Sequence, residues 1–113
     1  MKRSNKLFIE DIIESIDKIE DYIKDMSYEE FIDEQMVIDA VIRNLEVIGE
    51  AAKNLSDDIK NKYKNIPWKR IIGLRNIVIH GYFGIDLSII WEIVTKNLQD
   101  IKPNIENINE KID

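Results

Sequence analysis

The chain has 113 residues, a net charge of −6 and no cysteine. This length allows one domain with a hydrophobic core, residues 1–113, and is too short for two. Without cysteine no disulfide or thiolate metal site can form, and one histidine is too few for an ordinary zinc site. We therefore expect a single domain that works without a metal or another cofactor.

The N-terminal segment MKRSNKLFIEDIIESI has a basic start, but acidic residues interrupt its apolar ones. It therefore lacks the continuous apolar core of a signal peptide. No stretch of the chain approaches the roughly 18 apolar residues of a membrane span. We expect a cytoplasmic protein with no membrane partner.

Charge is unevenly distributed along the chain. Acidic residues outnumber basic ones in residues 1–58, whereas residues 59–85 contain no acid and six basic residues: Lys60, Lys62, Lys64, Lys69, Arg70 and Arg75. The negative total argues against a general nucleic-acid coat protein. The basic segment indicates an anion-binding surface, although an ordinary solvated surface would show the same run of charge.

Apolar residues recur at three- and four-residue steps, the period of amphipathic helices. A first helix is predicted after the N-cap Ser4, through KLFIEDIIESIDKIEDYIK. A second begins with the capping box of Ser27 and Glu30 and continues, with Met36 on its apolar stripe, for about 27 residues. Gly49 in this helix indicates a close crossing with another helix, of this chain or of a second chain.

Three further helices are predicted in the second half of the chain. Ser56 caps a short helix, DDIKNKYKN. Pro67 lies in the first turn of PWKRIIGLRNIVIHG, which Gly81 ends in a left-handed conformation. Asp86 caps LSIIWEIVTKNLQDIK, where Pro103 should kink or break the helix. We therefore expect an all-α protein, an up-down bundle of about five helices.

The segment GLRNIVIHGYFGID, residues 73–86, contains the only histidine of the chain. At a helix C-terminus the dipole favours the imidazolium of His80 and the nearby Arg75 opposes it, a balance that suits a general acid or base. Asn76 lies four residues before His80 on the same helix face, so its amide can orient the imidazole. Arg75 lies about 140° around an ideal helix from His80, so only its long side chain reaches the same point.

An arginine and a histidine together could cleave RNA without a metal. The arginine binds a phosphate and stabilises the charge of the transition state, and the histidine transfers a proton. This chemistry uses two proton-transfer groups, which a two-fold dimer of a one-histidine chain supplies. Lys69 and Arg70, earlier in the same helix, are candidates for RNA binding. An ordinary helix ending would show the same local pattern.

The pattern Arg75-x4-His80-x-Tyr82 resembles the Arg-x4-6-His motif of HEPN domains, in particular the Arg-x4-His-x-Tyr form of HepT-like toxins. Asn76 also matches, because HEPN motifs often have a polar residue after the arginine. The segments IPWKRIIGLRNIVIHGYFGID and DAVIRNLEVIGEAAKNLS resemble blocks of the HepT-like family. With the flanking helices, the resemblance covers nearly the whole chain.

This resemblance implies a HEPN bundle that forms a homodimer, with motif residues of both chains in a shared cleft. It implies a metal-independent endoribonuclease, the toxin of a HEPN/MNT toxin–antitoxin system, with Arg75 and His80 catalytic and Asn76 and Tyr82 supporting. It also implies a cognate MNT-type nucleotidyltransferase antitoxin. Such antitoxins can add AMP to the motif tyrosine, here Tyr82, where a bulky anion would block RNA.

An alternative is a non-catalytic helical module that binds a nucleotidyltransferase as its nucleotide-binding or substrate-presenting partner. In that case Arg75 and His80 bind a nucleotide phosphate without cleaving it. The acidic net charge favours this alternative, whereas the complete Arg/His/Tyr set favours the toxin. A purely structural helical dimer is the third interpretation.

Other residues have weaker functional signals. Trp68 and Trp91 are expected in the core or an interface rather than as platforms for base stacking. Arg43, Asn44 and Glu46 lie in a block that resembles the family, but Arg43 and Glu46 are three residues apart and can simply pair on a helix.

Overall fold

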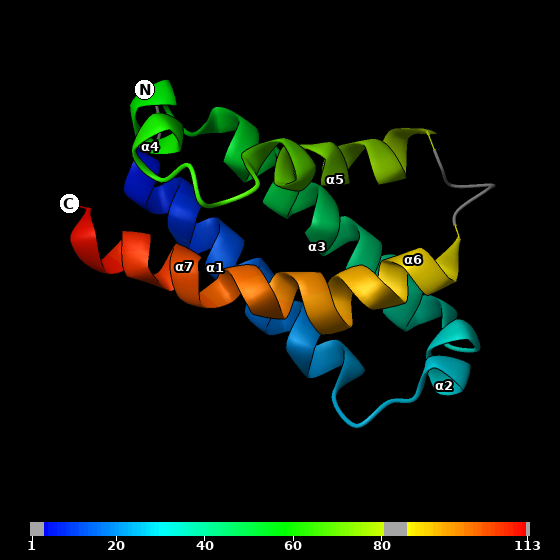
Figure 1. Cartoon of the computed structure of the whole chain (residues 1–113). Helices are drawn as coiled ribbons and strands as arrows, with labels where there is room; N and C mark the ends of the chain where they lie inside the picture. Colours follow the sequence, from blue (N-terminus) through cyan, green and yellow to red (C-terminus); the bar gives the residue numbers. More distant parts are fainter. Residues whose placement is uncertain (1–3, 81–85, 113) are drawn as a thin grey trace.

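The computed structural model describes residues 4–80 and 86–112, without the side chains of residues 77–80, and all regular structure in this part is helical (Figure 1). The elements are α1 (Asn5–Ile23), α2 (Tyr28–Ile32), α3 (Gln35–Asn54), α4 (Asp57–Lys62), α5 (Trp68–His80), α6 (Leu87–Glu92), a π-helical turn η1 (Ile93–Asn97) and α7 (Leu98–Lys111). Figure 1 shows α1, α3, α5 and the run α6–η1–α7 alternating in direction, which confirms the all-α bundle. None of the described helices has the length and apolar character needed to cross a membrane.

Four helices begin at the predicted caps. The side chains of Ser4, Ser27, Ser56 and Asp86 each accept a hydrogen bond from a backbone N–H two or three residues further along. Glu30 completes the capping box by accepting a hydrogen bond from the backbone N–H of Ser27. Each cap satisfies a donor that has no partner inside its helix, so local chemistry sets these starting points.

The second predicted helix is divided into α2 and α3, and the prediction of one continuous stripe was wrong. Phe31 in α2 is fully buried, whereas Met36 at the start of α3 is 85% exposed. Phe31 packs against Trp91 of α6, with 5.0 Å between their ring centroids, and Tyr28 also contacts Trp91. The break between α2 and α3 allows α2 to reach this aromatic cluster, and Trp91 has the core role expected for it.

Pro103 was predicted to kink or break the last helix, and it does not break it. The helical run continues through it from α6 to the end of α7. A proline inside a helix removes a hydrogen bond and costs about 3 kcal/mol. The buried apolar residues of α7 offset this cost, since each contributes about 1.5–3 kcal/mol on full burial; they are Leu98, Ile101, Ile105 and Ile108.

The helices α3 and α5 meet backbone to backbone at Gly49. A Cβ atom at this position would lie 2.7 Å from the backbone nitrogen of Arg75 and 3.1 Å from the carbonyl oxygen of Ile72. Any side chain would force the two helices apart, so glycine is required by the close approach. The close crossing predicted at Gly49 is confirmed, and its partner is α5 of the same chain.

The substitution Gly49→Ala should lower the free energy of unfolding by about 1–3 kcal/mol, because the new methyl group overlaps the backbone of α5. Gly73→Ala is the matched control, since a Cβ atom there meets nothing within 4 Å. It should stabilise the protein by up to about 1 kcal/mol, the usual advantage of alanine over glycine in a helix. Urea denaturation measures both changes, and equal effects at the two glycines would contradict the crossing.

Candidate functional site

Arg75 is held where α5 crosses α3. Its backbone nitrogen faces Gly49, and its side-chain Nε lies 2.9 Å from Oε2 of Glu50. The side chains of Arg75 and Glu50 are 30% and 49% exposed, so the ion pair lies at the surface. The contact is made at Nε, and the guanidinium has further N–H donors at its two Nη groups for a phosphate. The arginine predicted to be catalytic is therefore anchored but accessible.

Two of the remaining motif residues, Asn76 and His80, lie in the C-terminal half of α5. His80 is the last residue of α5, as predicted, and its side chain lies outside the description. Gly81 and Tyr82 also lie outside the described residues, so the conformation of Gly81 and the arrangement of Arg75, His80 and Tyr82 stay predictions. Asn76 has an exposed side chain that makes no hydrogen bond with any described residue, and its role in orienting His80 is likewise a prediction.

The motif lies at one end of the bundle. Figure 1 shows the end of α5 and the start of α6 at the opposite end of the molecule from both chain termini. Asp86, the cap of α6, accepts hydrogen bonds from Ser88, which lower the pKa of the Asp86 carboxyl group. The last turn of α5 and the capped first turn of α6 thus lie at the same end of the bundle.

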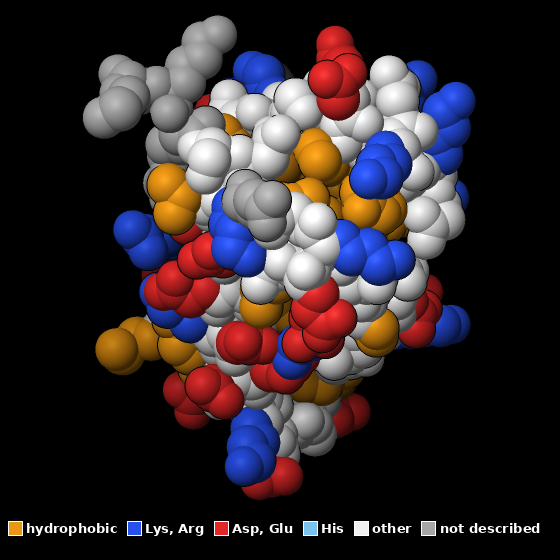
Figure 2. All heavy atoms as spheres, turned by 90° about the vertical axis from the view of Figure 1, so that its left-hand side faces the viewer, with side chains coloured by type: hydrophobic (Ala, Val, Ile, Leu, Met, Phe, Trp, Pro, Cys, Tyr) orange, Lys and Arg blue, Asp and Glu red, His pale blue; other side chains and the backbone are white. Residues whose placement is uncertain are grey.

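Basic side chains of α4 and α5 lie on the surface. Figure 2 shows Lys and Arg gathered over the upper part of the end that carries α4, with most Asp and Glu side chains below them. Lys69 and Arg70 are exposed, and neither forms an ion pair within the described part of the chain. Both remain candidates for binding a polyanion.

A groove of about 620 Å³ separates α5 from the η1–α7 run. Its floor is apolar and includes Leu74 and Ile101, and Arg70 is part of its lining. Three asparagines and one acidic residue also line it: Asn65, Asn97, Asn104 and Asp100. A cation and amide groups around an apolar floor are suited to hold a nucleotide. Leu74 lines this groove, whereas the next residue, Arg75, is not part of its lining and faces α3 instead.

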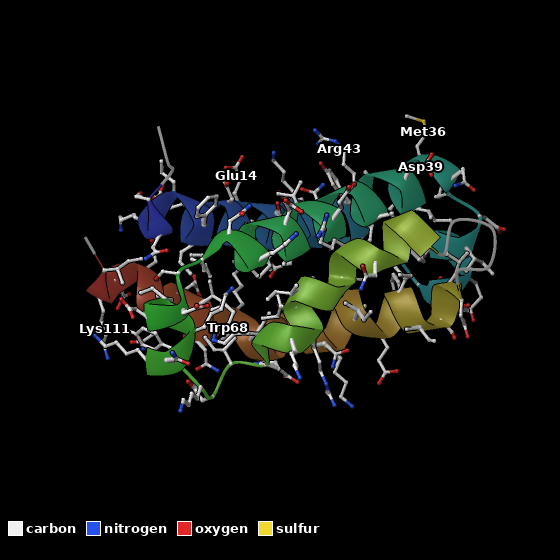
Figure 3. All side chains as sticks on the ribbon, turned by 90° about the horizontal axis from the view of Figure 1, so that it is seen from above. Glu14, Met36, Asp39, Arg43, Trp68 and Lys111 are labelled. Atoms are coloured by element: carbon white, nitrogen blue, oxygen red, sulfur yellow. The ribbon has the colours of Figure 1, made fainter. Side chains whose placement is uncertain are left out.

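The residues Arg43, Asn44 and Glu46 do not form the expected pair. Figure 3 shows Arg43 pointing outward from α3, away from α5, and no ion pair joins it to Glu46. The pairing prediction was wrong, because a three-residue spacing permits contact without requiring it. Asn44 is buried and donates a hydrogen bond to the carbonyl oxygen of Ala40, 2.9 Å away, which is a structural role.

Trp68 has the predicted structural role. It is 8% exposed, and its indole Nε1 donates a hydrogen bond to the carbonyl oxygen of Tyr63 at 3.1 Å. This contact fixes the start of α5 against the segment after α4. Trp68 therefore has no free ring face for stacking on a base.

Glu50 is the site residue that sequence reasoning missed. Its ion pair with Arg75 joins two helices and residues far apart in the chain, so no local spacing reports it. The available signal was the neighbouring Gly49: in a helix, the residue next to a crossing glycine lies beside the helix that crosses there. An acidic residue at that point is placed to meet a basic residue of the crossing helix.

Known proteins with similar sequences span almost the whole chain. The sequence profile described as "Ribonuclease HepT-like" matches residues 12–108. The chain is 47% identical over 105 residues to "Putative RNase MJ1380" of Methanocaldococcus jannaschii, which covers 93% of this chain and 96% of that protein. It is 38% identical over 110 residues to "Probable ribonuclease HepT" of Thermococcus cleftensis, which covers 97% of this chain and 100% of that protein. No significant match among solved structures was found.

Proposed function

The chain belongs to the ribonuclease HepT-like family, and from this premise we propose that it is a metal-independent endoribonuclease toxin neutralised by a nucleotidyltransferase antitoxin. Family membership and the names of its relatives support ribonuclease activity. The observation that carries the mechanism is the anchoring of Arg75 by α3, five residues before the only histidine.

The proposed reaction uses Arg75 and His80 in different roles. The guanidinium of Arg75 binds the scissile phosphate and stabilises the charge that builds on it. One His80 imidazole takes the proton of the ribose 2′-hydroxyl, whose oxygen then attacks phosphorus and forms a 2′,3′-cyclic phosphate. The bond from phosphorus to the 5′-oxygen breaks, and His80 of the partner subunit, as imidazolium, protonates that oxygen. Asn76 and Tyr82 support the site.

Substrate binding is assigned to the basic side of α5. Lys69 and Arg70 offer two exposed charges, and Arg70 lines the groove between α5 and the η1–α7 run. A single-stranded RNA held by these charges would cross α5 to bring a phosphate to Arg75. Phosphate binding of this kind weakens as the salt concentration rises, because the counterions that binding releases from the RNA then gain less entropy.

Wild-type protein should cleave single-stranded RNA in the presence of EDTA, because the mechanism uses no metal. His80→Ala should slow cleavage by about 10²–10⁴-fold through loss of proton transfer. Arg75→Ala should slow it by about 10²–10³-fold through loss of charge stabilisation. Gel assays on a labelled oligonucleotide measure the rates. Arg43→Ala, which removes an exposed arginine that points away from α5, is the matched control and should cleave normally.

The alternative, a non-catalytic partner of a nucleotidyltransferase, is favoured by the net charge of −6. The same assay separates it from the toxin. RNA bound by wild type, His80→Ala and Arg75→Ala alike, and cut equally slowly by all three, would contradict the enzyme and support the phosphate-binding module.

The purified protein should be a homodimer of about 27 kDa, twice the 13.3 kDa chain. The physical reason is that two proton-transfer groups are required and each chain supplies one histidine. Multi-angle light scattering at micromolar concentration measures the mass. A monomer under these conditions would contradict the shared cleft.

Co-expression with a minimal nucleotidyltransferase encoded beside this chain should add one or more AMP groups at Tyr82. In this step the phenolic oxygen attacks the α-phosphorus of ATP and pyrophosphate leaves. Intact-mass spectrometry should show the adduct on wild-type protein and on Tyr22→Phe, which removes an exposed tyrosine of α1, but not on Tyr82→Phe. An unmodified wild type beside an active partner would indicate neutralisation by steric blocking.

A further inference from the structure

We propose that Glu50 is a positioning residue of the ribonuclease reaction, which holds Arg75 by its Nε and presents the rest of the guanidinium to the RNA phosphate. The proposal rests on the proposed function. It starts from two neighbouring residues of α3, Gly49 and Glu50, which contact the same residue of α5 in different ways.

The first contact fixes the main chain of Arg75. The missing side chain of Gly49 lets the two helix backbones approach so closely that a Cβ atom would lie 2.7 Å from the Arg75 nitrogen and 3.2 Å from its Cβ. Both elements are helices, so the base of the Arg75 side chain is attached to a rigid scaffold. Sites placed on rigid elements hold their geometry better than sites on loops.

The second contact fixes the side chain. Arginine has a long, flexible side chain, and ordering it when RNA binds would oppose binding and turnover. The ion pair of 2.9 Å between Nε and Glu50 Oε2 orders the side chain before RNA arrives. Small displacements of such a group reduce the rate steeply, because the phosphate and the attacking oxygen must be aligned.

Stability alone does not explain the ion pair. Arg75 and Glu50 have side chains that are 30% and 49% exposed. Water screens a pair of this exposure, and such pairs contribute little to folding. A carboxylate beside a phosphate-binding arginine also repels the substrate, so its presence needs a compensating benefit. Orientation of Arg75 is that benefit.

Glu50 also restricts the direction from which RNA reaches Arg75. It lines a second groove, of about 420 Å³, between α1 and α3, together with the acidic residues Asp11 and Glu46. Phosphates are repelled from this side, whereas the groove on the other side of α5 has one basic residue, Arg70, and one acidic residue, Asp100. The acidic groove therefore disfavours an approach of RNA to Arg75 from the α1–α3 side.

Removal of Glu50 should consequently affect binding and turnover in opposite directions. Loss of its negative charge should leave KM unchanged or lower it, because RNA is repelled less. Loss of the contact with Nε should lower kcat by about 10–100-fold, the usual range for residues that orient a functional group. A purely structural role would not separate the two constants in this way.

The test compares Glu50→Ala, Glu50→Gln and Glu46→Gln in steady-state cleavage of a fluorogenic RNA oligonucleotide. Glu50→Gln keeps an oxygen that can accept from Nε, so it should retain more of kcat than Glu50→Ala. Glu46→Gln removes a charge one turn earlier in α3, in the same groove and without an ion pair to Arg75. It should lower KM slightly and leave kcat unchanged. Thermal unfolding should be similar for all three.

A second measurement reports the ion pair without activity. In the nuclear magnetic resonance spectrum of arginine side chains, the Nε–H signal of Arg75 should exchange slowly with water in wild type and Glu46→Gln, and rapidly in Glu50→Ala. A kcat of Glu50→Ala equal to or above wild type would overturn the proposal, and so would an equal loss of kcat in Glu46→Gln. If the wild type cuts no RNA at all, the ribonuclease function fails and this role fails with it. If Arg75→Ala is impaired but Glu50→Ala is not, the role of Glu50 fails alone.

Discussion

The backbone contact between α3 and α5 at Gly49 determines where the candidate site is built. α3 packs on α1 as well as on α5, so α5 is attached to the core chiefly through α3. On its other side α5 faces the groove toward η1 and α7. One side of the helix is therefore fixed and the other is open. Arg75 lies on the fixed side, and Arg70 lines the open side.

Sequence reasoning predicted those parts of the fold that local chemistry decides. The caps at Ser4, Ser27, Ser56 and Asp86 involve neighbours within three residues, and all four lie where expected. The break before α3 was missed, because it depends on the packing of α2 against α6, which lies far along the chain. The continuation of the helix through Pro103 was missed for the same reason: the cost is local, but the burial that offsets it involves the whole bundle.

The candidate site shows the same difference between local features, which the sequence predicts, and contacts between distant residues, which it does not. Spacing placed His80 at a helix end, which the structure confirms, because a helix end is a local property. The prediction of Arg75 as a site residue rested on spacing together with the family resemblance. Spacing also predicted a pair between Arg43 and Glu46 that does not form. The ion pair that does form joins Arg75 of α5 to Glu50 of α3, so it connects two helices. Only Gly49 indicated that two helices cross there. Glycine destabilises a helix interior, so its presence in α3 calls for a structural explanation.

The uneven charge of the chain explains how a protein with a net charge of −6 can act on RNA. At physiological salt a charge is screened beyond about 8 Å, so a phosphate responds to the side chains near it rather than to the total. The exposed charges of α5 itself are basic, although Asp100 lines the groove beside it, and the charges between α1 and α3 are acidic. In the proposed mechanism the acids of that second groove act as a boundary that keeps phosphates away from the α1–α3 side of Arg75. Glu50 belongs to this boundary and also pairs with Arg75, so in this proposal a single carboxylate links the path of the substrate to the orientation of the arginine.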